Sequence, residues 1–152
     1  GVDTDAVANV NIPLPPGAGH VAYLHAMERV VRPALREFEP EIIIIACGYD
    51  ASGVDPLARM LAGSDTFAAM TRSVMEAADE LCDGRLAMAH EGGYSEVHVP
   101  FCGHAVLSEM AQSDIVAADP LGARITAHQP DERMNAVYRG LIDEIAVHNG
   151  YR

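Results

Sequence analysis

The chain has 152 residues, 49% of them hydrophobic and 21% charged, which suits one folded domain with a core of its own. Its net charge of −12 argues against nucleic acid as a partner, because phosphate binding needs a basic surface. No apolar stretch approaches the roughly 20 residues of a membrane-spanning helix and no signal peptide is visible, so we expect neither membrane insertion nor export.

The first third of the chain contains a predicted strand and a predicted helix. Residues Val7 to Leu14 form a short predicted strand that ends in a loop of prolines and a glycine, which cannot continue a ladder. Apolar residues then recur at helical spacing from Tyr23 to Phe38. Pro33 falls inside that pattern, so it should kink or divide the helix.

The most apolar run of the chain, Ile42 to Cys47, has no polar alternation. This pattern indicates a strand buried on both faces, as in a parallel sheet covered by helices. The loop from Asp50 to Ser64 is long, and long loops in compact domains are usually functional or mobile. Ser64 is a candidate cap for the next helix, which should stop at Asp83-Gly84.

The remaining segments continue the alternation of strands and helices. We predict a third strand over Arg85 to Ala89 and helices over about Val99 to Ala111 and Asp131 to His148, whereas Ser113 to Pro130 has no clear pattern. The order favours an α/β fold with a parallel sheet flanked by helices, in a single unit over residues 1–152. This small sheet cannot be fully covered by the chain itself, which also begins with Gly, so we expect it to be part of a larger unit.

Two polar side chains follow the ends of predicted strands. Asp50 comes after the isoleucine-rich strand and Tyr94 after the third strand. Ligands of parallel sheets bind at the carboxyl ends of strands, and neighbouring strands lie about 5 Å apart, so both side chains should meet at one pocket. A carboxylate there can ligate a metal or act as a base, and a tyrosine hydroxyl can stabilise a developing oxyanion. An aspartate that caps a turn and a tyrosine that anchors one are the structural alternatives.

Four short motifs occur in order along the chain: the run from Asn9 to Gly17, Gly48-Tyr49-Asp50, Asp55-Pro56-Leu57, and Glu91-Gly92-Gly93-Tyr94. Together they resemble the second half of the histone-deacetylase-like zinc amidohydrolases, in the branch of the bacterial class II deacetylases and acetylpolyamine amidohydrolases. The resemblance runs from Asn9 to about Met110, and the tail beyond Ser113 matches no motif of the family.

The resemblance implies an arginase-like or deacetylase-like α/β fold and a catalytic zinc, of which Asp50 would be the last ligand. Tyr94 would be the catalytic residue that hydrogen-bonds the substrate carbonyl and the tetrahedral oxyanion. Leu57 and Gly93 would bind substrate along its channel, and Asp55 would support the loop. The implied reaction is hydrolysis of the acetyl amide of acetylated lysine or acetylpolyamines.

The family's other zinc ligands lie in an Asp-x-His motif and its acid–base pair is His-His, and neither string occurs here. Of the seven histidines, only His90 adjoins a candidate residue, while His20 and His25 fall in the first predicted helix, where surface or core roles are expected. A catalytic zinc normally takes three protein ligands. The chain therefore carries half an active site and needs the N-terminal half of the domain.

Two other function classes compete with a deacetylase. A truncated or degenerate deacetylase-like module with a structural or binding role would also lack these ligands. A nucleotide-binding module is disfavoured by the absence of both G-x-G-x-x-G and a Walker loop. Cys47, Cys82 and Cys102 have no metal-type spacing and suit free thiols in the cytoplasm, and a homo-oligomer is possible.

Overall fold

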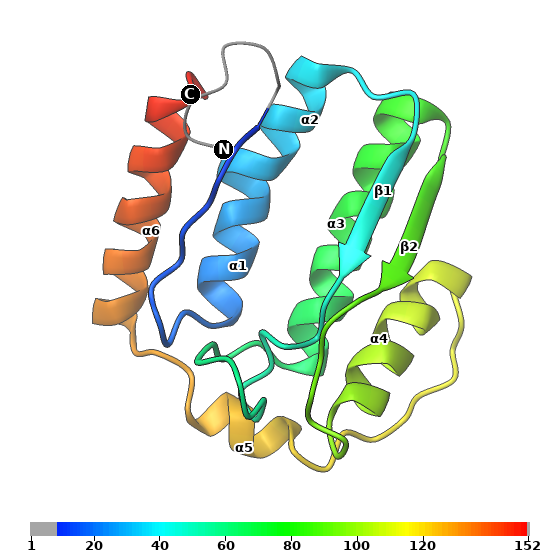
Figure 1. The fold of residues 1–152 in the computed structure, drawn as a ribbon, viewed down its shortest axis with the longest axis vertical. Helices are drawn as coiled ribbons and strands as arrows, with labels where there is room; N and C mark the ends of the chain where they lie inside the picture. Colours follow the sequence, from blue (N-terminus) through cyan, green and yellow to red (C-terminus); the bar gives the residue numbers. More distant parts are fainter. Residues whose placement is uncertain (1–8, 152) are drawn as a thin grey trace.

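The structure, a computed structural model, describes residues 9–151 and has the predicted α/β class (Figure 1). Two strands and a series of helices follow one another along the chain. In order they are α1 (His20–Ala26), η1 (Met27–Val31), α2 (Arg32–Phe38), β1 (Ile43–Cys47), α3 (Ser64–Cys82), β2 (Leu86–His90), α4 (Val99–Ala111), α5 (Gly122–Ala127) and α6 (Glu132–His148).

The two strands β1 and β2 pair in parallel, with Ile43 opposite Leu86 and Cys47 opposite His90. Helix α3 connects them and packs on the sheet, as does α4 (Figure 1). Because the strands run in the same direction and in register, both end at the same edge of the sheet. The loops that follow them therefore begin side by side, as expected for a ligand site of a parallel sheet.

The prediction that the isoleucine-rich strand is buried on both faces is wrong for the described part of the chain. Ile43 is 5% exposed, whereas its neighbour Ile44 is 69% exposed. Helices α3 and α4 cover the face of Ile43 and Met88, and nothing in residues 9–151 covers the face of Ile44. An apolar run indicates that a strand is buried from water, but it does not indicate which part of the protein packs over each face of the strand.

The prediction of a strand over Val7 to Leu14 is also wrong for the residues that the structure describes. Residues 9–14 are extended but pair with no strand, and residues 7 and 8 lie outside the described part. Val10, Ile12 and Leu14 instead pack against the core between α1 and α6. Their alternation resembles that of a strand because an extended segment also turns alternate side chains to one side.

Pro33 interrupts the first helix as predicted. The run from His20 to Phe38 is helical throughout, but it is divided by η1, a π-helical turn that ends at Val31, two residues before the proline. A proline inside a helix lacks an N–H and its ring crowds the carbonyl one turn earlier. A π-helical turn widens the helix at that point, which accommodates both effects.

The predicted bounds of the later helices agree with the structure except at one cap. Helix α3 begins at Ser64, so its N-cap is Gly63 and the prediction that Ser64 caps it is wrong. The helix ends at Asp83 in the left-handed conformation, next to Gly84, as predicted. The segment without a clear pattern contains the short helix α5.

The C-terminal helix α6 packs against α1 and η1 and completes the second layer of helices (Figure 1). Its N-cap Asp131 accepts a hydrogen bond from the backbone N–H of Met134 at 2.9 Å, which fixes where the helix starts. Tyr138 and Ile142 of α6 are buried against Ala22 and Val30. Within residues 9–151, no helix is both long enough and apolar enough to cross a bilayer.

Candidate active site

The carboxylate of Asp50 lies in a niche made by two glycines. A Cβ atom on Gly92 would lie 2.6 Å from Asp50 Oδ2, and one on Gly48 would lie 2.8 Å from Asp50 Oδ1. The backbone N–H of Tyr49 donates to the carbonyl of Gly92 at 2.9 Å, which joins the two loops at this point. The absence of side chains at both glycines thus gives the carboxylate its place beside the turn that leads to Tyr94.

Tyr23 of α1 faces the same carboxylate. Burial and the nearby charge of Asp50 raise the pKa of Tyr23 to about 12. Its phenol therefore stays protonated at neutral pH, and Asp50 has a neutral neighbour on the side of α1.

Tyr94 is held by its backbone and leaves its ring accessible. Tyr94 is 55% exposed, while its backbone N–H donates to Asp55 Oδ2 at 2.8 Å. Asp50 and Tyr94 follow strands that end side by side, and Asp50 contacts Gly92 in the turn before Tyr94. The structure thus brings the two loops together, and a pocket shared by both side chains stays a prediction.

Asp55 joins the loop after Asp50 to the loop of Tyr94. Its buried carboxylate accepts three backbone N–H groups, from Leu57 at 2.8 Å, Ala58 at 3.2 Å and Tyr94. Burial alone would raise the pKa of Asp55, but these hydrogen bonds hold that pKa below its usual range. This is the supporting position that the resemblance implies for Asp55.

Replacing Asp55 with Ala should lower the free energy of unfolding of the complete protein at pH 7 by about 2–4 kcal/mol, because three N–H groups lose their acceptor. A lowered folded pKa gives stability that is present above the unfolded value of about 3.9 and lost as pH falls through the folded pKa. The difference between wild type and D55A should therefore shrink below about pH 4. Urea unfolding at several pH values measures this difference in the free energy of unfolding. Asp55→Asn, which keeps one acceptor oxygen, should have a stability between those of wild type and D55A. A difference between wild type and D55A that does not change with pH would contradict this role.

The two predicted substrate-binding residues have different surroundings. Leu57 is 71% exposed on the loop after Asp50, which is compatible with contact to a ligand. Gly93 has φ +126°, and a Cβ there would lie 3.0 Å from Tyr49 Cβ and from Val99 Cγ2. The backbone conformation and close packing thus require glycine at 93, and the substrate-binding role of both residues stays a prediction.

The histidines singled out in the sequence make structural contacts. The ring of His90 lies 5.0 Å from that of Tyr49, and its Nε2 is 3.2 Å from the carbonyl oxygen of Gly92. His25 Nε2 lies 2.9 Å from Asp143 Oδ1 in the interface between α1 and α6.

The residues near Asp50 do not by themselves make a zinc site. Among the described residues, no group of three or more His, Cys, Asp or Glu side chains is arranged to hold a metal ion. A catalytic zinc normally takes three protein ligands, so Asp50 would need partners from beyond residues 9–151. The donor type and the open niche fit one ligand of such a set.

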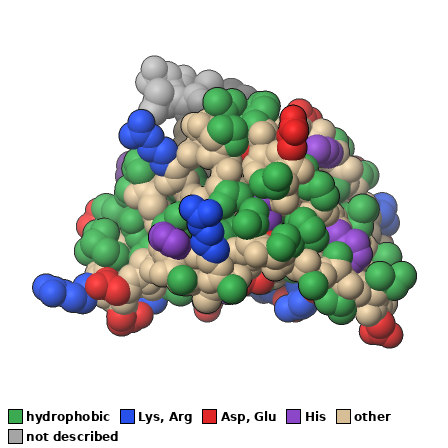
Figure 2. All heavy atoms as spheres, turned by 90° about the horizontal axis from the view of Figure 1, so that it is seen from below, with side chains coloured by type: hydrophobic (Ala, Val, Ile, Leu, Met, Phe, Trp, Pro, Cys, Tyr) green, Lys and Arg blue, Asp and Glu red, His purple; other side chains and the backbone are tan. Residues whose placement is uncertain are grey.

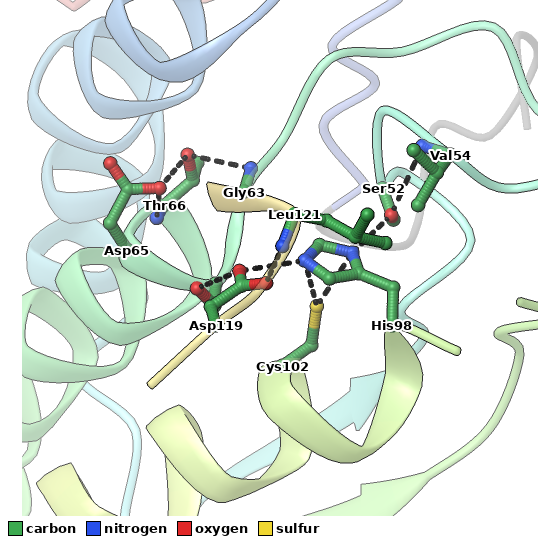
Figure 3. A network of polar contacts seen from close by, with 10 residues as sticks. Ser52, Val54, Gly63, Asp65, Thr66, His98, Cys102, Asp119 and Leu121 are labelled. Atoms are coloured by element: carbon green, nitrogen blue, oxygen red, sulfur yellow. Dashed lines mark hydrogen bonds and ion pairs between the residues drawn. The ribbon is translucent and has the colours of Figure 1, made fainter. Parts of the chain in front are cut away.

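A polar network behind Asp50 was missed in the sequence (Figure 3). His98, at the N-cap of α4, is fully buried. Its Nδ1 lies 2.6 Å from Ser52 Oγ and its Nε2 lies 2.9 Å from Asp119 Oδ2. The sequence contains no pattern that predicts this network, because a single histidine before a helix does not indicate which residues its ring contacts.

The Ser52–His98–Asp119 arrangement has the residue types of a hydrolytic triad but not its exposure. Ser52 is 1% exposed and His98 is fully buried, so no substrate can reach the hydroxyl. Burial also raises the pKa of the neighbouring Cys102 thiol to about 12, which keeps it protonated and unreactive. The network therefore holds loops together and does not supply a nucleophile.

The face toward which both strands end shows hydrophobic side chains and histidines over its middle, with most Asp and Glu toward the rim (Figure 2). The net charge of −12 is thus not concentrated on this face.

The sequence is similar to known proteins over most of its length. The histone deacetylase domain family matches residues 1–110. The histone deacetylase-like amidohydrolase of Pseudomonas aeruginosa is 47% identical over 150 residues, which are 99% of this chain and 40% of that protein. Histone deacetylase 8 of Arabidopsis thaliana is 33% identical over 138 residues, covering 90% of this chain and 35% of that protein.

The fold has solved counterparts. The structure of the histone deacetylase Clr3 superposes with a TM-score of 0.69 at 26% identity, covering 91% of this chain and 22% of that chain. This chain thus spans well under half the length of the relatives it matches. The tail that carries Asp119 lies beyond the family match but within the alignment to the Pseudomonas relative. On this evidence, the chain belongs to the histone deacetylase domain family.

Proposed function

We propose that the complete protein containing this chain is a zinc-dependent deacetylase that hydrolyses the acetyl amide of acetylated lysine or of acetylpolyamines. This chain would contribute the C-terminal half of the active site. The observation that carries the proposal is the position of the Asp50 carboxylate, which packs against Gly48 and Gly92 beside the loop of Tyr94. Membership of the deacetylase family supports it.

The residues have separate roles in the proposed reaction. A zinc ion bound by Asp50 and by ligands outside this chain would polarise the amide carbonyl and activate a water molecule. Tyr94 would donate its hydroxyl proton in a hydrogen bond to the carbonyl oxygen as negative charge develops there. Leu57, exposed on the neighbouring loop, would contact the apolar part of an acyl-lysine or acylpolyamine chain.

The open side of the sheet supports the need for the rest of the domain. Ile44 is 69% exposed in the middle of a parallel strand, and strands of parallel sheets are normally covered on both faces. The chain spans 40% of the Pseudomonas relative. The missing cover and the missing ligands would come from the same N-terminal half. A cytoplasmic location and self-association remain part of the proposal.

A second candidate is a deacetylase-like module without catalysis, which serves a structural or binding role. The observation in its favour is that the described residues hold no group of three possible metal ligands. In that case the same fold would persist as a scaffold.

Acetate release by the complete protein separates the two candidates. We expect release from an acetyl-lysine peptide or from an acetylated polyamine, loss of this activity after chelation, and its return on addition of zinc. The peptide and the polyamine, assayed side by side, also identify the substrate class. Absence of acetate release from both substrates, with zinc present, would favour the module without catalysis.

A further inference from the structure

We propose that His98 is a positioning residue of this site, whose imidazole fixes the Asp50 loop and the Tyr94 loop relative to each other and anchors both to Asp119 in the C-terminal segment. The role of these loops in deacetylation rests on the function proposed above. The linkage itself rests on the contacts of His98 alone (Figure 3).

The direction of the hydrogen bonds follows from the partners. An ionised Asp119 can only accept, so His98 Nε2 carries the hydrogen and donates to Oδ2. In a neutral imidazole Nδ1 is then an acceptor, and it takes the hydroxyl hydrogen of Ser52. Ser52 Oγ in turn accepts from the backbone N–H of Val54 at 3.3 Å. Both ring nitrogens of His98 and the hydroxyl of Ser52 thus have hydrogen-bond partners.

The imidazole reaches both candidate loops at their turns. Ser52 lies in the turn directly after Asp50, where its N–H donates to the carbonyl of Tyr49 at 3.1 Å. His98 itself closes the turn after Tyr94, where its N–H donates to the carbonyl of Ser95 at 3.1 Å. One side chain therefore spans from the Tyr94 loop to the Asp50 loop.

Asp119 anchors the hydrogen-bond linkage through His98. Its carboxylate accepts from His98, from Ser64 Oγ at 2.7 Å and from the backbone N–H of Leu121 at 2.8 Å. Burial alone would raise the pKa of Asp119, but these donors hold the pKa below its usual range. Ser64 is the first residue of α3, a helix that packs on the sheet. The linkage thus ends on a rigid element of the fold.

Loss of the imidazole would leave the buried Ser52 hydroxyl and the partly buried Asp119 carboxylate without this partner. Such groups are costly in a dry interior, so the loops would move until water or other groups satisfied them. A displacement of about 1 Å at a catalytic group can lower a rate by about 10²-fold. We therefore expect the effect of His98 to appear in catalysis as well as in stability.

The test compares His98→Leu with His98→Gln in the complete, metal-loaded protein. Leucine fills similar volume without hydrogen bonds, whereas the Gln amide offers one acceptor and one donor, as the neutral imidazole does. We expect H98L to lower kcat by about 10²-fold with KM changed by less than about threefold, and H98Q to recover most of kcat. His104→Leu is the matched control, because His104 lies within α4 and its ring also lies within hydrogen-bond distance of a serine, Ser108 of the same helix. It should leave kcat near the wild-type value.

A more electrophilic substrate separates positioning from simple loss of folded protein. Trifluoroacetyl-lysine needs less help at its carbonyl than acetyl-lysine does. If H98L misplaces Asp50 and Tyr94, its loss should be several-fold smaller on the trifluoroacetyl substrate than on the acetyl substrate. If H98L merely reduces the folded fraction, both substrates lose equally, and that equality would overturn the proposal.

Hydrogen exchange gives a readout without activity. The amides of the Asp50–Ala58 and Tyr94–Val99 segments should exchange faster in H98L than in wild type and H104L, while those of α6 stay unchanged. If H98L does not fold, Ser52→Ala removes the same link without a large void and should show the same exchange pattern. Faster exchange in H98L, together with a wild-type protein that releases no acetate, would uphold the linkage and refute the proposed function. Unchanged exchange in both loops would refute the linkage whatever the activity.

Discussion

Replacing Asp50 with Asn in the complete protein should lower kcat/KM for an acetyl-lysine peptide by about 10³-fold or more. The amide keeps the shape of the carboxylate but removes the negative charge that would bind a cation. A catalytic metal contributes several kcal/mol to the transition state, and each 1.36 kcal/mol is a factor of about ten in rate. Steady-state kinetics and the bound zinc per protein, measured on the same sample, give the result.

Asp114→Asn is the matched control, because Asp114 is exposed on the segment after α4 and belongs to neither candidate loop. It should leave both the rate and the zinc content unchanged. D50N should also leave the free energy of unfolding of the metal-free protein within about 1 kcal/mol of wild type, since Asn fits the same niche between Gly48 and Gly92. A D50N protein that keeps its zinc and its rate would remove Asp50 from the proposed active site.

The parts of the fold that local patterns control could be predicted. Helix α4 has the predicted bounds, Val99–Ala111, because Pro100 in its first turn and its apolar spacing act within the segment itself. The exposure of Ile44 could not be predicted, since it depends on which elements pack over the sheet. The extended segment with Val10 and Ile12 shows the same limit, because alternation fixes one side of a segment and not its partner.

The candidate site divides in the same way. Asp50 and Tyr94 could be found because each follows a strand that the sequence itself indicates. His98 could not, since its partners Ser52 and Asp119 lie 46 and 21 residues away and come together only in the folded chain. Asp119 also lies in the segment where the sequence shows no clear pattern.

Replacing Tyr94 with Phe should lower kcat by about 10²–10³-fold, the effect typical of removing one oxyanion donor, with little change in KM. Tyr94 is 55% exposed, and its contact to Asp55 is made by the backbone N–H and not by the hydroxyl, so the fold should be unaffected. Steady-state kinetics with acetyl-lysine and trifluoroacetyl-lysine peptides measure the loss, which should be smaller for the more electrophilic acyl group. Tyr151→Phe is the control and should match wild type, because Tyr151 packs against the core cluster of Val30 and Ile142.

Combining the two changes shows whether His98 acts through Tyr94. Groups that act as a unit are not additive, so once the Tyr94 hydroxyl is gone, its misplacement can cost nothing more. In a Y94F background, His98→Leu should therefore lower kcat by much less than in wild type, and what remains would reflect the Asp50 loop alone. Full additivity would mean that His98 does not act through Tyr94. A Y94F protein with the wild-type rate on acetyl-lysine would instead remove the tyrosine hydroxyl from the proposed reaction.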